Sequence, residues 1–302
     1  MSLNGWLYLD KPIGFTSNRI LNIIKRNLRK VKMGYVGTLD PLASGFLPIA
    51  LGKATRVIRY LGNFDKEYIF TVKWGIKTST ADSEGEEIGK TFYLPNFHNI
   101  KSSLIQVLKL KFQIPPKFSA KKINGQRAYN LARKGKKFDL SPQKIKIYKL
   151  KLIKHNSKFQ STFYVKCSAG TYVRTIAENL AEICGTYGHV CYLRRIGFGK
   201  LNKKLISLDS FLSLMHIDTL INELKPVDYI FEGEKKISLD EVEAKKLING
   251  QPINLDNNLK SSNFLDLNLN SRVIAKYKKK LLVVGYIKKN EYYPKTVLDL
   301  DD

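Results

Sequence analysis

The alternation of apolar and polar residues predicts several strands in the first two thirds of the chain. Residues 6–10 form a short apolar run that ends at a Lys-Pro pair and a glycine turn. Residues 68–76 place an aromatic or β-branched side chain at every second position, which is typical of one face of a strand. Two further strands are predicted at residues 144–152 and 159–167. The larger part of the chain is therefore expected to be rich in strands.

Apolar residues that recur every three or four positions predict helices between these strands. Thr16 or Ser17 caps a first helix whose apolar side chains fall on one face. A second helix is predicted over residues 100–112 and a third over residues 173–183, each ended by a nearby proline or glycine. Because strands and helices do not alternate strictly, we predict an α+β fold with a mixed, mostly antiparallel sheet flanked by helices.

The composition of the chain changes near residues 225–226, which indicates a domain boundary. Residues 1–230 are expected to form the larger domain. Residues 235–302 are expected to form a small β-rich domain, with a helix around residues 240–248 and three short strands at the end. Residues 254–271, rich in Asn, Ser and Leu, are interpreted as a long polar insertion in that small domain.

Charge narrows the choice of partner. The 302 residues include 52 Lys and Arg against 26 Asp and Glu, a formal net charge of +26. Such an excess opposes compaction, and a polyanionic partner usually explains it. The basic residues are spread from Arg19 to Lys295 rather than confined to one amphipathic helix, which favours nucleic acid over an anionic membrane. A lysine-rich proteome would produce a similar charge without such a partner, and charge alone leaves that alternative open.

Cysteine content and hydropathy favour the cytoplasm and give no sign of a metal site. Three cysteines in 302 residues suit a reducing compartment, and the N-terminus lacks the features of a signal peptide. No run approaches the ~18 apolar residues that a membrane span needs. Cys184, His189 and Cys191 are close in sequence, but without a fourth ligand they are interpreted as ordinary residues rather than a zinc site.

The segment with the clearest chemical content is residues 34–52, which contains Asp40 among four glycines. Pro41 biases Asp40 away from the helical conformation and fixes the turn that follows it. A carboxylate on a rigid loop of a strongly basic protein is expected to stay ionised, as a nucleophile or general base requires. Asp-Pro is also a common turn, and without further context the purely structural interpretation is favoured.

A resemblance to a known family changes that balance. The run GYVGTLDPLASG at residues 34–45, followed by GKAT at residues 52–55, resembles the catalytic motif of the TruB family of bacterial tRNA pseudouridine-55 synthases. Residues from Ile237 onward resemble the family's small PUA-type RNA-binding domain. Other segments resemble family motifs in the expected order: LDKP at 9–12, DKEY at 65–68, GTYVRT at 170–175 and YLRR at 192–195. Together these segments cover essentially the whole chain.

The resemblance implies that the protein converts uridine 55 of the tRNA T-loop to pseudouridine without a cofactor or metal. Asp40 aligns with the catalytic aspartate and Arg174 with an arginine that pairs with it. Tyr68 aligns with a tyrosine that stacks on the target base and is implicated in removing the proton from C5. Tyr172 and Leu193 align with positions that line the uridine pocket. Residues 1–230 would then be the catalytic domain and residues 235–302 a PUA-like RNA-binding domain.

Two further features concern the grip on RNA. Tyr35 stands where the family usually has a histidine thought to fill the space left by the extruded base. Since tyrosine also stacks on bases, Tyr35 is expected to keep that role, and simple packing is the alternative. The resemblance also makes residues 113–140 an insertion that closes over the T-loop. Its candidates for contact with the RNA backbone are Lys121, Lys122 and Arg127.

The residues themselves suit this chemistry but leave alternatives open. Isomerisation breaks the N1–C1′ bond of an everted uridine, turns the uracil and joins C5 to C1′, so a carboxylate beside the sugar is a natural catalyst. Whether Asp40 attacks C1′ or removes a proton from C2′ stays open.

Taken without the resemblance, Arg174 is equally well a surface arginine in a helix's first turn, and Tyr68 is a core tyrosine. The acidic residues 82–87 are expected to face away from phosphate, with Asp82 at most a hydrogen-bond acceptor at the pocket rim.

A monomer without an obligate protein partner is expected. A tRNA-binding and folding factor with little catalysis is the alternative function, and a hydrolase that cleaves the glycosidic bond is a third.

Overall fold

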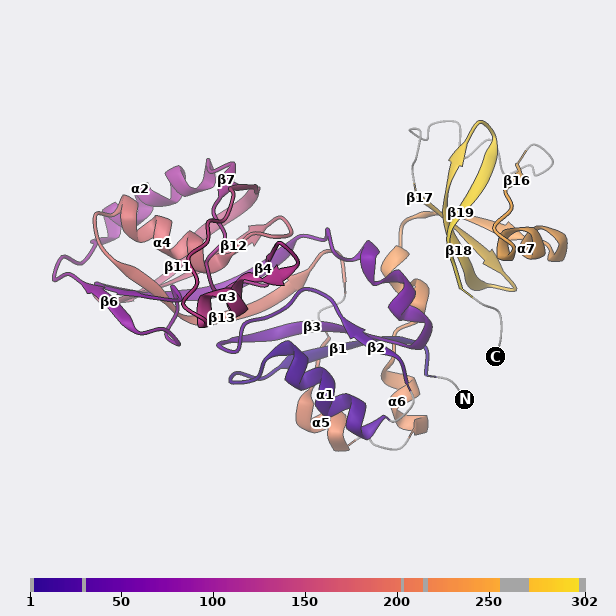
Figure 1. Cartoon of the computed structure of the whole chain (residues 1–302), viewed down its shortest axis with the longest axis horizontal. Helices are drawn as coiled ribbons and strands as arrows, with labels where there is room; N and C mark the ends of the chain where they lie inside the picture. The colour runs from indigo at the N-terminus through magenta and orange to yellow at the C-terminus, as the bar shows by residue number, and fades with distance from the viewer. Residues whose placement is uncertain (1–2, 29–30, 202–203, 214–216, 256–271, 299–302) are drawn as a thin grey trace.

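The structure is a computed structural model with a long unit that carries the N-terminus and a smaller C-terminal unit (Figure 1). Each unit is built around its own sheet. The stretch predicted as a polar insertion lies, beyond Leu255, outside the described residues. The described residues are 3–28, 31–201, 204–213, 217–255 and 272–298.

The long unit contains an eight-stranded sheet in the described part of the chain. Its strands run in the order β11-β12-β4-β13-β3-β1-β14, and β2 pairs with β3. Among these pairs only β13–β3 and β1–β14 are parallel, so the predicted mixed, mostly antiparallel sheet is confirmed. The strands are β1 (Gly5–Lys11), β2 (Met33–Tyr35), β3 (Ala43–Leu51), β4 (Lys66–Trp74), β11 (Ile147–Ser157), β12 (Gln160–Cys167), β13 (Gly188–Phe198) and β14 (Ile206–Ser207).

The helices of this unit flank the sheet. Thr16 caps α1, since its side chain accepts a hydrogen bond from the backbone N–H of Arg19. α4 packs against β13 and β4, and α2 packs against α4 and β11, so these two helices cover one part of the sheet (Figure 1). The helical elements are α1 (Ser17–Asn27), α2 (Phe97–Leu108), α4 (Val173–Ile183), α5 (Leu208–Ser213), α6 (Ile217–Glu223) and the 3₁₀ helices η1 (Gly52–Tyr60) and η2 (Val227–Phe231).

Two predicted elements end earlier than the apolar pattern indicates. The strand expected over residues 68–76 stops at Trp74, because Gly75 adopts a φ of 86° and breaks the extended run before β5 (Ile76–Thr78). The helix expected over residues 100–112 stops at Leu108, and the exposed Phe112 belongs to a short strand instead. In both places the last apolar residue of the predicted pattern, Ile76 or Phe112, belongs to the next element of the structure.

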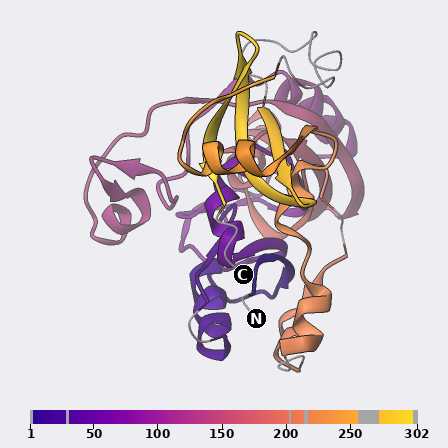
Figure 2. The same cartoon turned by 90° about the vertical axis from the view of Figure 1, so that its right-hand side faces the viewer.

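A segment between two paired strands projects from the body of the long unit, as Figure 2 shows. Its root is the pair β7 (Phe112–Gln113) and β10 (Gln143–Lys144), and the segment contains a two-stranded hairpin and a short helix. This region is the predicted insertion over residues 113–140. The elements are β8 (Lys122–Ile123), β9 (Gln126–Arg127) and α3 (Ala128–Arg133).

The C-terminal unit has a five-stranded sheet, ordered β15-β17-β18-β19-β16 in the described residues. A capping box formed by Asp240 and Glu243 starts its helix. Its assignment as a PUA-like domain, and the boundaries 1–230 and 235–302, stay predictions. The elements are β15 (Lys235–Leu239), α7 (Glu241–Ile248), β16 (Ile253–Asn254), β17 (Arg272–Tyr277), β18 (Lys280–Lys288) and β19 (Glu291–Val297).

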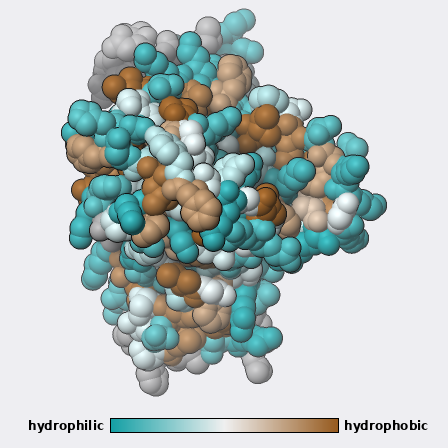
Figure 3. Space-filling model, turned by 90° about the vertical axis from the view of Figure 1, so that its left-hand side faces the viewer, coloured by the Kyte–Doolittle hydropathy of each residue, from teal (hydrophilic) through white to brown (hydrophobic). Residues whose placement is uncertain are grey.

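A shared apolar cluster joins the two units. Trp6 and Phe46 of the large sheet pack in one cluster with Phe231 of η2 and with Ile274 and Val284 of the C-terminal sheet. At the opposite end, where the β6 (Glu87–Lys90) hairpin and α2 lie, apolar side chains are mixed with hydrophilic ones on the surface (Figure 3). Among the described helices, none is long and apolar enough to cross a membrane.

Candidate active site

Asp40 lies in the short loop that leads into β3, and this loop is tied to the start of α1. The buried Ser17 hydroxyl donates to the Leu39 carbonyl at 3.1 Å, and the Leu39 N–H donates to the same hydroxyl oxygen at 2.8 Å. The Asp40 carbonyl accepts a hydrogen bond from the Ala43 N–H at 3.1 Å. The Asp40 side chain is still 35% exposed, so a fixed backbone presents an accessible carboxylate.

The Lys-Pro motif at the end of β1 is hydrogen-bonded to the segments on either side of this turn, including the loop that carries Asp40. Lys11 is fully buried, and its ammonium donates to the carbonyls of Pro12 at 2.8 Å and Phe15 at 2.6 Å. The Gly14 N–H donates to the Pro41 carbonyl at 2.9 Å. Burial lowers the pKa of Lys11 to about 8, and the negative charge of Asp40 opposes that shift. Lys11 therefore adds a buried cation near Asp40.

Arg174, in the first turn of α4, connects four parts of the chain through one guanidinium. Its Nε lies 2.9 Å from Oδ2 of Asp40, and its Nη1 lies 3.5 Å from Oδ2 of Asp82. Nη1 also donates to the Thr80 carbonyl at 3.0 Å, and Nη2 donates to the Phe118 carbonyl at 2.9 Å. The side chain is only 4% exposed, so Arg174 is not a surface residue. These contacts fix the direction in which it holds Asp40.

Asp82 lies inside the site, and its predicted place at the pocket rim is wrong. Its side chain is 2% exposed and accepts hydrogen bonds from the Thr80 hydroxyl at 2.5 Å and from the Glu84 N–H at 3.0 Å. Ala81, the residue before it, adopts a φ of 60°, a conformation that is uncommon for alanine. The acidic loop thus supplies a second carboxylate to Arg174, which the sequence pattern did not indicate.

The groups around Asp40 have opposite effects on the pKa of its carboxyl. Burial raises the pKa of the Asp40 carboxyl and the charge of Asp82 adds to that shift, whereas Arg174 and Lys11 lower it. The sequence predicted only the basic neighbours. The same effects act on Glu84, whose pKa is raised by burial and by Asp82 and Asp40. The carboxylates of Asp40, Asp82 and Glu84 thus lie near the cations of Arg174 and Lys11, and Arg174 makes the direct contact with Asp40.

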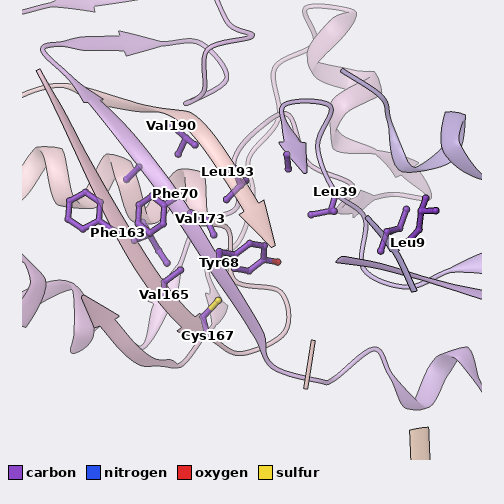
Figure 4. Packing of buried hydrophobic residues seen from close by; sticks show 14 of the residues in the cluster. Leu9, Leu39, Tyr68, Phe70, Phe163, Val165, Cys167, Val173, Val190 and Leu193 are labelled. Carbon is purple, nitrogen blue, oxygen red and sulfur yellow. The ribbon is translucent and has the colours of Figure 1, made fainter. Parts of the chain in front are cut away.

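Tyr68 belongs both to the main core and to the site. Its side chain is 9% exposed, and the ring lies beside Leu193 and Val173 with its hydroxyl oxygen directed out of the cluster toward the side of Leu39 (Figure 4). Arg195 of β13 is the register partner of Tyr68 on the neighbouring strand. Burial raises the pKa of Tyr68 and Arg195 lowers it, while the charge of Asp40 adds to the rise. Tyr68 is therefore a core residue, as the sequence alone indicated, and its hydroxyl is still close enough to Asp40 and Arg195 to be affected by their charges.

A family model described as "TruB family pseudouridylate synthase (N terminal domain)" matches residues 25–173. The tRNA pseudouridine synthase B of Ehrlichia canis is 41% identical over 257 residues, which cover 84% of this chain and 85% of that protein. The tRNA pseudouridine synthase B of Rickettsia bellii is 37% identical over 297 residues, 98% of each chain. The chain belongs to the TruB family. The resemblance seen in the sequence motifs is therefore confirmed.

Solved structures support the fold of this TruB-family chain. A protein in the structure titled "Structure of H/ACA RNP bound to a substrate RNA containing 2'-deoxyuridine" matches with a TM-score of 0.69 and 21% identity. The match covers 99% of this chain and 86% of that one. A chain of an "archaeal box H/ACA sRNP Nop10-Cbf5 complex" gives the same TM-score of 0.69. The likeness extends over the long unit and the C-terminal unit and confirms the predicted fold class.

The other predicted pocket residues of the TruB motifs lie on elements that adjoin Asp40 and Tyr68. Leu193 is buried on β13, opposite Phe70 of β4 and Ala43 of β3. Tyr172 directly precedes α4, and its N–H donates to Oε1 of Gln113 at 2.8 Å, while its carbonyl accepts from Nε2 at 3.1 Å. This pair of bonds connects the root of the insertion to the start of α4.

Tyr35 is partly buried against the main core at the end of β2, opposite Ile49 of β3. It therefore has a packing contact whether or not it also stacks on RNA. Lys121, Lys122 and Arg127, the predicted backbone contacts, are partly or fully exposed on the insertion. Lys121 donates to the Gln143 side chain at 3.2 Å.

Two residues have contacts in the site that were not predicted from the sequence: Asp82, which was expected only as a hydrogen-bond acceptor at the pocket rim, and Arg195. The signal for Arg195 is weak, since it is the second of two consecutive arginines and only the family motif at residues 192–195 marks it.

Among the described residues, no group of three His, Cys, Asp or Glu side chains is placed to hold a metal ion. His189 instead places its Nδ1 3.0 Å from the Ile76 carbonyl oxygen.

Proposed function

We propose that the protein isomerises uridine 55 in the T-loop of tRNA to pseudouridine, with Asp40 as the catalytic carboxylate. The observation that carries this proposal is the 2.9 Å contact between Arg174 and an accessible Asp40. Relatives that match most of the chain are named tRNA pseudouridine synthase B, which supports the same substrate and reaction.

The proposed reaction acts on a uridine turned out of its loop, because a stacked base leaves no access to the sugar. Asp40 faces C1′ of the ribose while the N1–C1′ bond breaks, either as the nucleophile at C1′ or as the base that takes the C2′ proton. Both routes need an anion aimed by Arg174. Tyr68 stacks on the uracil and removes the C5 proton after C5 has joined C1′. The reaction transfers no electrons, so it needs no redox cofactor.

RNA binding is proposed to involve three parts of the chain. Tyr172 and Leu193 line the uridine pocket, and Tyr35 fills the place of the everted base. The insertion at residues 113–140 grips the RNA backbone, with Lys121, Lys122 and Arg127 as the contacts. The PUA-like residues 235–302 add a second RNA-binding surface.

We also propose that the enzyme works in the cytoplasm as a monomer without an obligate protein partner. Its three cysteines are free thiols, as is usual in a reducing compartment.

The test is the release of tritium from a tRNA transcript tritiated at uracil C5. Wild-type protein is expected to release tritium from position 55 and leave the RNA mass unchanged, and a transcript with cytidine at position 55 is expected to release none from that site. Asp40→Asn is expected to abolish release while tRNA binding stays within about threefold, because the charge is lost but the shape is kept. Asp209→Asn, an exposed carboxylate on α5, is the matched control.

Other results would favour the other functions. Equal activity of Asp40→Asn and wild type would overturn the assignment of Asp40. Tight tRNA binding without any tritium release by wild type would favour a tRNA-binding and folding factor. Release of free uracil with loss of RNA mass would favour a hydrolase.

A further inference from the structure

Arg195 is a second buried arginine at this site, and the reaction outlined above gives it no role. Its side chain is 1% exposed. On β13 it is the register partner of Tyr68 on β4 and of Gly45 on β3, the strand that follows Asp40. Arg195 therefore lies between the strand that carries the phenol and the strand that begins after the carboxylate.

The guanidinium of Arg195 is held by neutral groups. Its Nε donates to the Phe46 carbonyl at 2.7 Å, and its Nη2 donates to the Gly37 carbonyl at 2.8 Å. It also lies 5.1 Å from the centre of the Phe198 ring, and its charge lowers the pKa of the Tyr68 hydroxyl on the neighbouring strand. In the described ranges no carboxylate forms an ion pair with it. A buried cation without an anion is costly, so this site stabilises any group beside it that becomes negative.

Two glycines of the motif around Asp40 make room for this arginine. A Cβ atom at Gly45 would lie 2.2 Å from the Arg195 carbonyl oxygen, and one at Gly37 would lie 3.0 Å from its Nη1. Both glycines have positive φ angles, 98° and 69°. Gly45 thus lets β3 approach the backbone of Arg195, and Gly37 leaves room for its guanidinium.

We propose that Arg195 is a positioning residue that directs the Tyr68 hydroxyl oxygen at the target base and stabilises its phenolate during proton transfer. This inference rests on the proposed function. After C5 has joined C1′, C5 still carries its hydrogen and N1 has none. The phenol proton moves to N1, and the phenolate then takes the C5 proton. The C5–H electron pair forms the C5–C6 double bond, and the π pair of the N1–C6 double bond returns to N1. One proton moves from C5 to N1 overall, and Tyr68 ends as the phenol it was at the start.

The surroundings of Tyr68 otherwise disfavour a phenolate. Burial and the charge of Asp40 both raise the pKa of Tyr68, and Arg195 lowers it. The Cys167 thiol on β12 is also near, but burial raises its pKa to about 12, so it stays neutral. Burial and the charge of Arg195 lower the pKa of Lys66 on β4 to about 8. Arg195 is therefore the cation that does most to lower the pKa of the phenol.

The experiment compares Arg195→Lys and Arg195→Met with wild type on three tRNAs, which carry hydrogen, deuterium or fluorine at C5 of uridine 55. Pseudouridine formation is expected to fall about 100-fold in Arg195→Met and about tenfold in Arg195→Lys, because the stabilisation of a developing anion is lost or weakened. The ratio of the rates with hydrogen and deuterium is expected to rise above the wild-type ratio in both. Fluorine does not leave C5 as a proton, so formation of the rearranged, still fluorinated nucleoside is expected to stay within about twofold of wild type.

Arg194→Lys is the matched control, since Arg194 is the adjacent residue of β13 and pairs with Asp10 at 2.6 Å instead. It is expected to leave the isotope ratio unchanged. Thermal unfolding checks each variant, and Arg195→Lys carries the test if Arg195→Met does not fold. Equal slowing with uridine and fluorouridine, or an unchanged isotope ratio in Arg195→Lys, would show a purely structural role and overturn the inference. Absence of pseudouridine with wild type would instead overturn the proposed function.

Discussion

Two regions are rich in charge: the catalytic centre, formed by Arg174 with Asp40 and Asp82, and the insertion between β7 and β10. They differ in the exposure of their charged side chains. In the centre, Arg174 is 4% exposed and contacts two carboxylates and two carbonyls at fixed distances. In the insertion, Lys122 and Arg127 are exposed. The two regions meet at Phe118, whose carbonyl accepts a hydrogen bond from Arg174.

This difference indicates a division of labour. Buried and fully directed charges act on the transition state, since they need no reorganisation when the reaction occurs. Exposed charges act on the encounter with a polyanion, and salt screens them. Substitutions in the centre are therefore expected to change the rate of the chemical step, and substitutions in the insertion are expected to change tRNA affinity.

Among the substitutions that test this contrast, Arg174→Lys is expected to have the largest effect. A single ammonium cannot reach Asp40, Asp82 and the Phe118 carbonyl together, as the planar guanidinium does. The rate of pseudouridine formation under single-turnover conditions is expected to fall about 1000-fold, whereas the Kd for tRNA is expected to stay within about threefold. Filter binding and tritium release measure the two quantities.

Arg26→Lys, an exposed arginine of α1, is the control for this substitution. If Arg174→Lys weakened binding by orders of magnitude and left the chemical step unchanged, the contrast between the two regions would be wrong.

A smaller effect is expected from Asp82→Asn. The loss of one charged partner of Arg174 in a buried site is expected to lower kcat about 30-fold. Because the charge of Asp82 raises the pKa of Asp40, its removal lowers that pKa. The acid limb of the kcat profile is therefore expected to move to lower pH, if that limb reports protonation of Asp40. A shift of this limb to higher pH would contradict the arrangement of charges around Asp40.

Elements with a clear apolar period were predictable from the sequence. α4 begins and ends as expected, at Val173 and Ile183, since its apolar face is buried and Gly185 stops it. The three C-terminal strands also lie where the pattern places them. β3 was missed, because all nine of its residues are buried and the alternation that identifies a strand is absent.

The site itself was predictable only in part. Asp40 stands out by its glycine-rich setting, but its pairing with Arg174 came from the family motif, because 133 residues separate the two along the chain. Asp82 was misplaced since an acidic loop in a basic protein resembles a solvated turn. Arg194 and Arg195 are chemically identical neighbours, and the period of a strand separates them without showing which one faces Tyr68.

The smallest effect is expected in the insertion, from replacing Lys121, Lys122 and Arg127 together by glutamine. The loss of the three proposed phosphate contacts is expected to weaken tRNA binding about tenfold at physiological salt. It is also expected to reduce the slope of log K against log salt by about 2 to 3, because fewer counterions are released. At saturating tRNA the rate of the chemical step is expected to stay within about twofold of wild type.

The matched control replaces three other exposed lysines by glutamine, Lys90, Lys101 and Lys109, which lie on the β6–α2 side of the long unit. It lowers the net charge by the same amount, so it separates the position of the charge from its total. If both triple variants weakened tRNA binding equally, tRNA affinity would depend only on the overall charge of +26 and not on where the charges lie. A loss of the chemical step at saturating tRNA would mean instead that the insertion, through Phe118, helps to hold Arg174 in place.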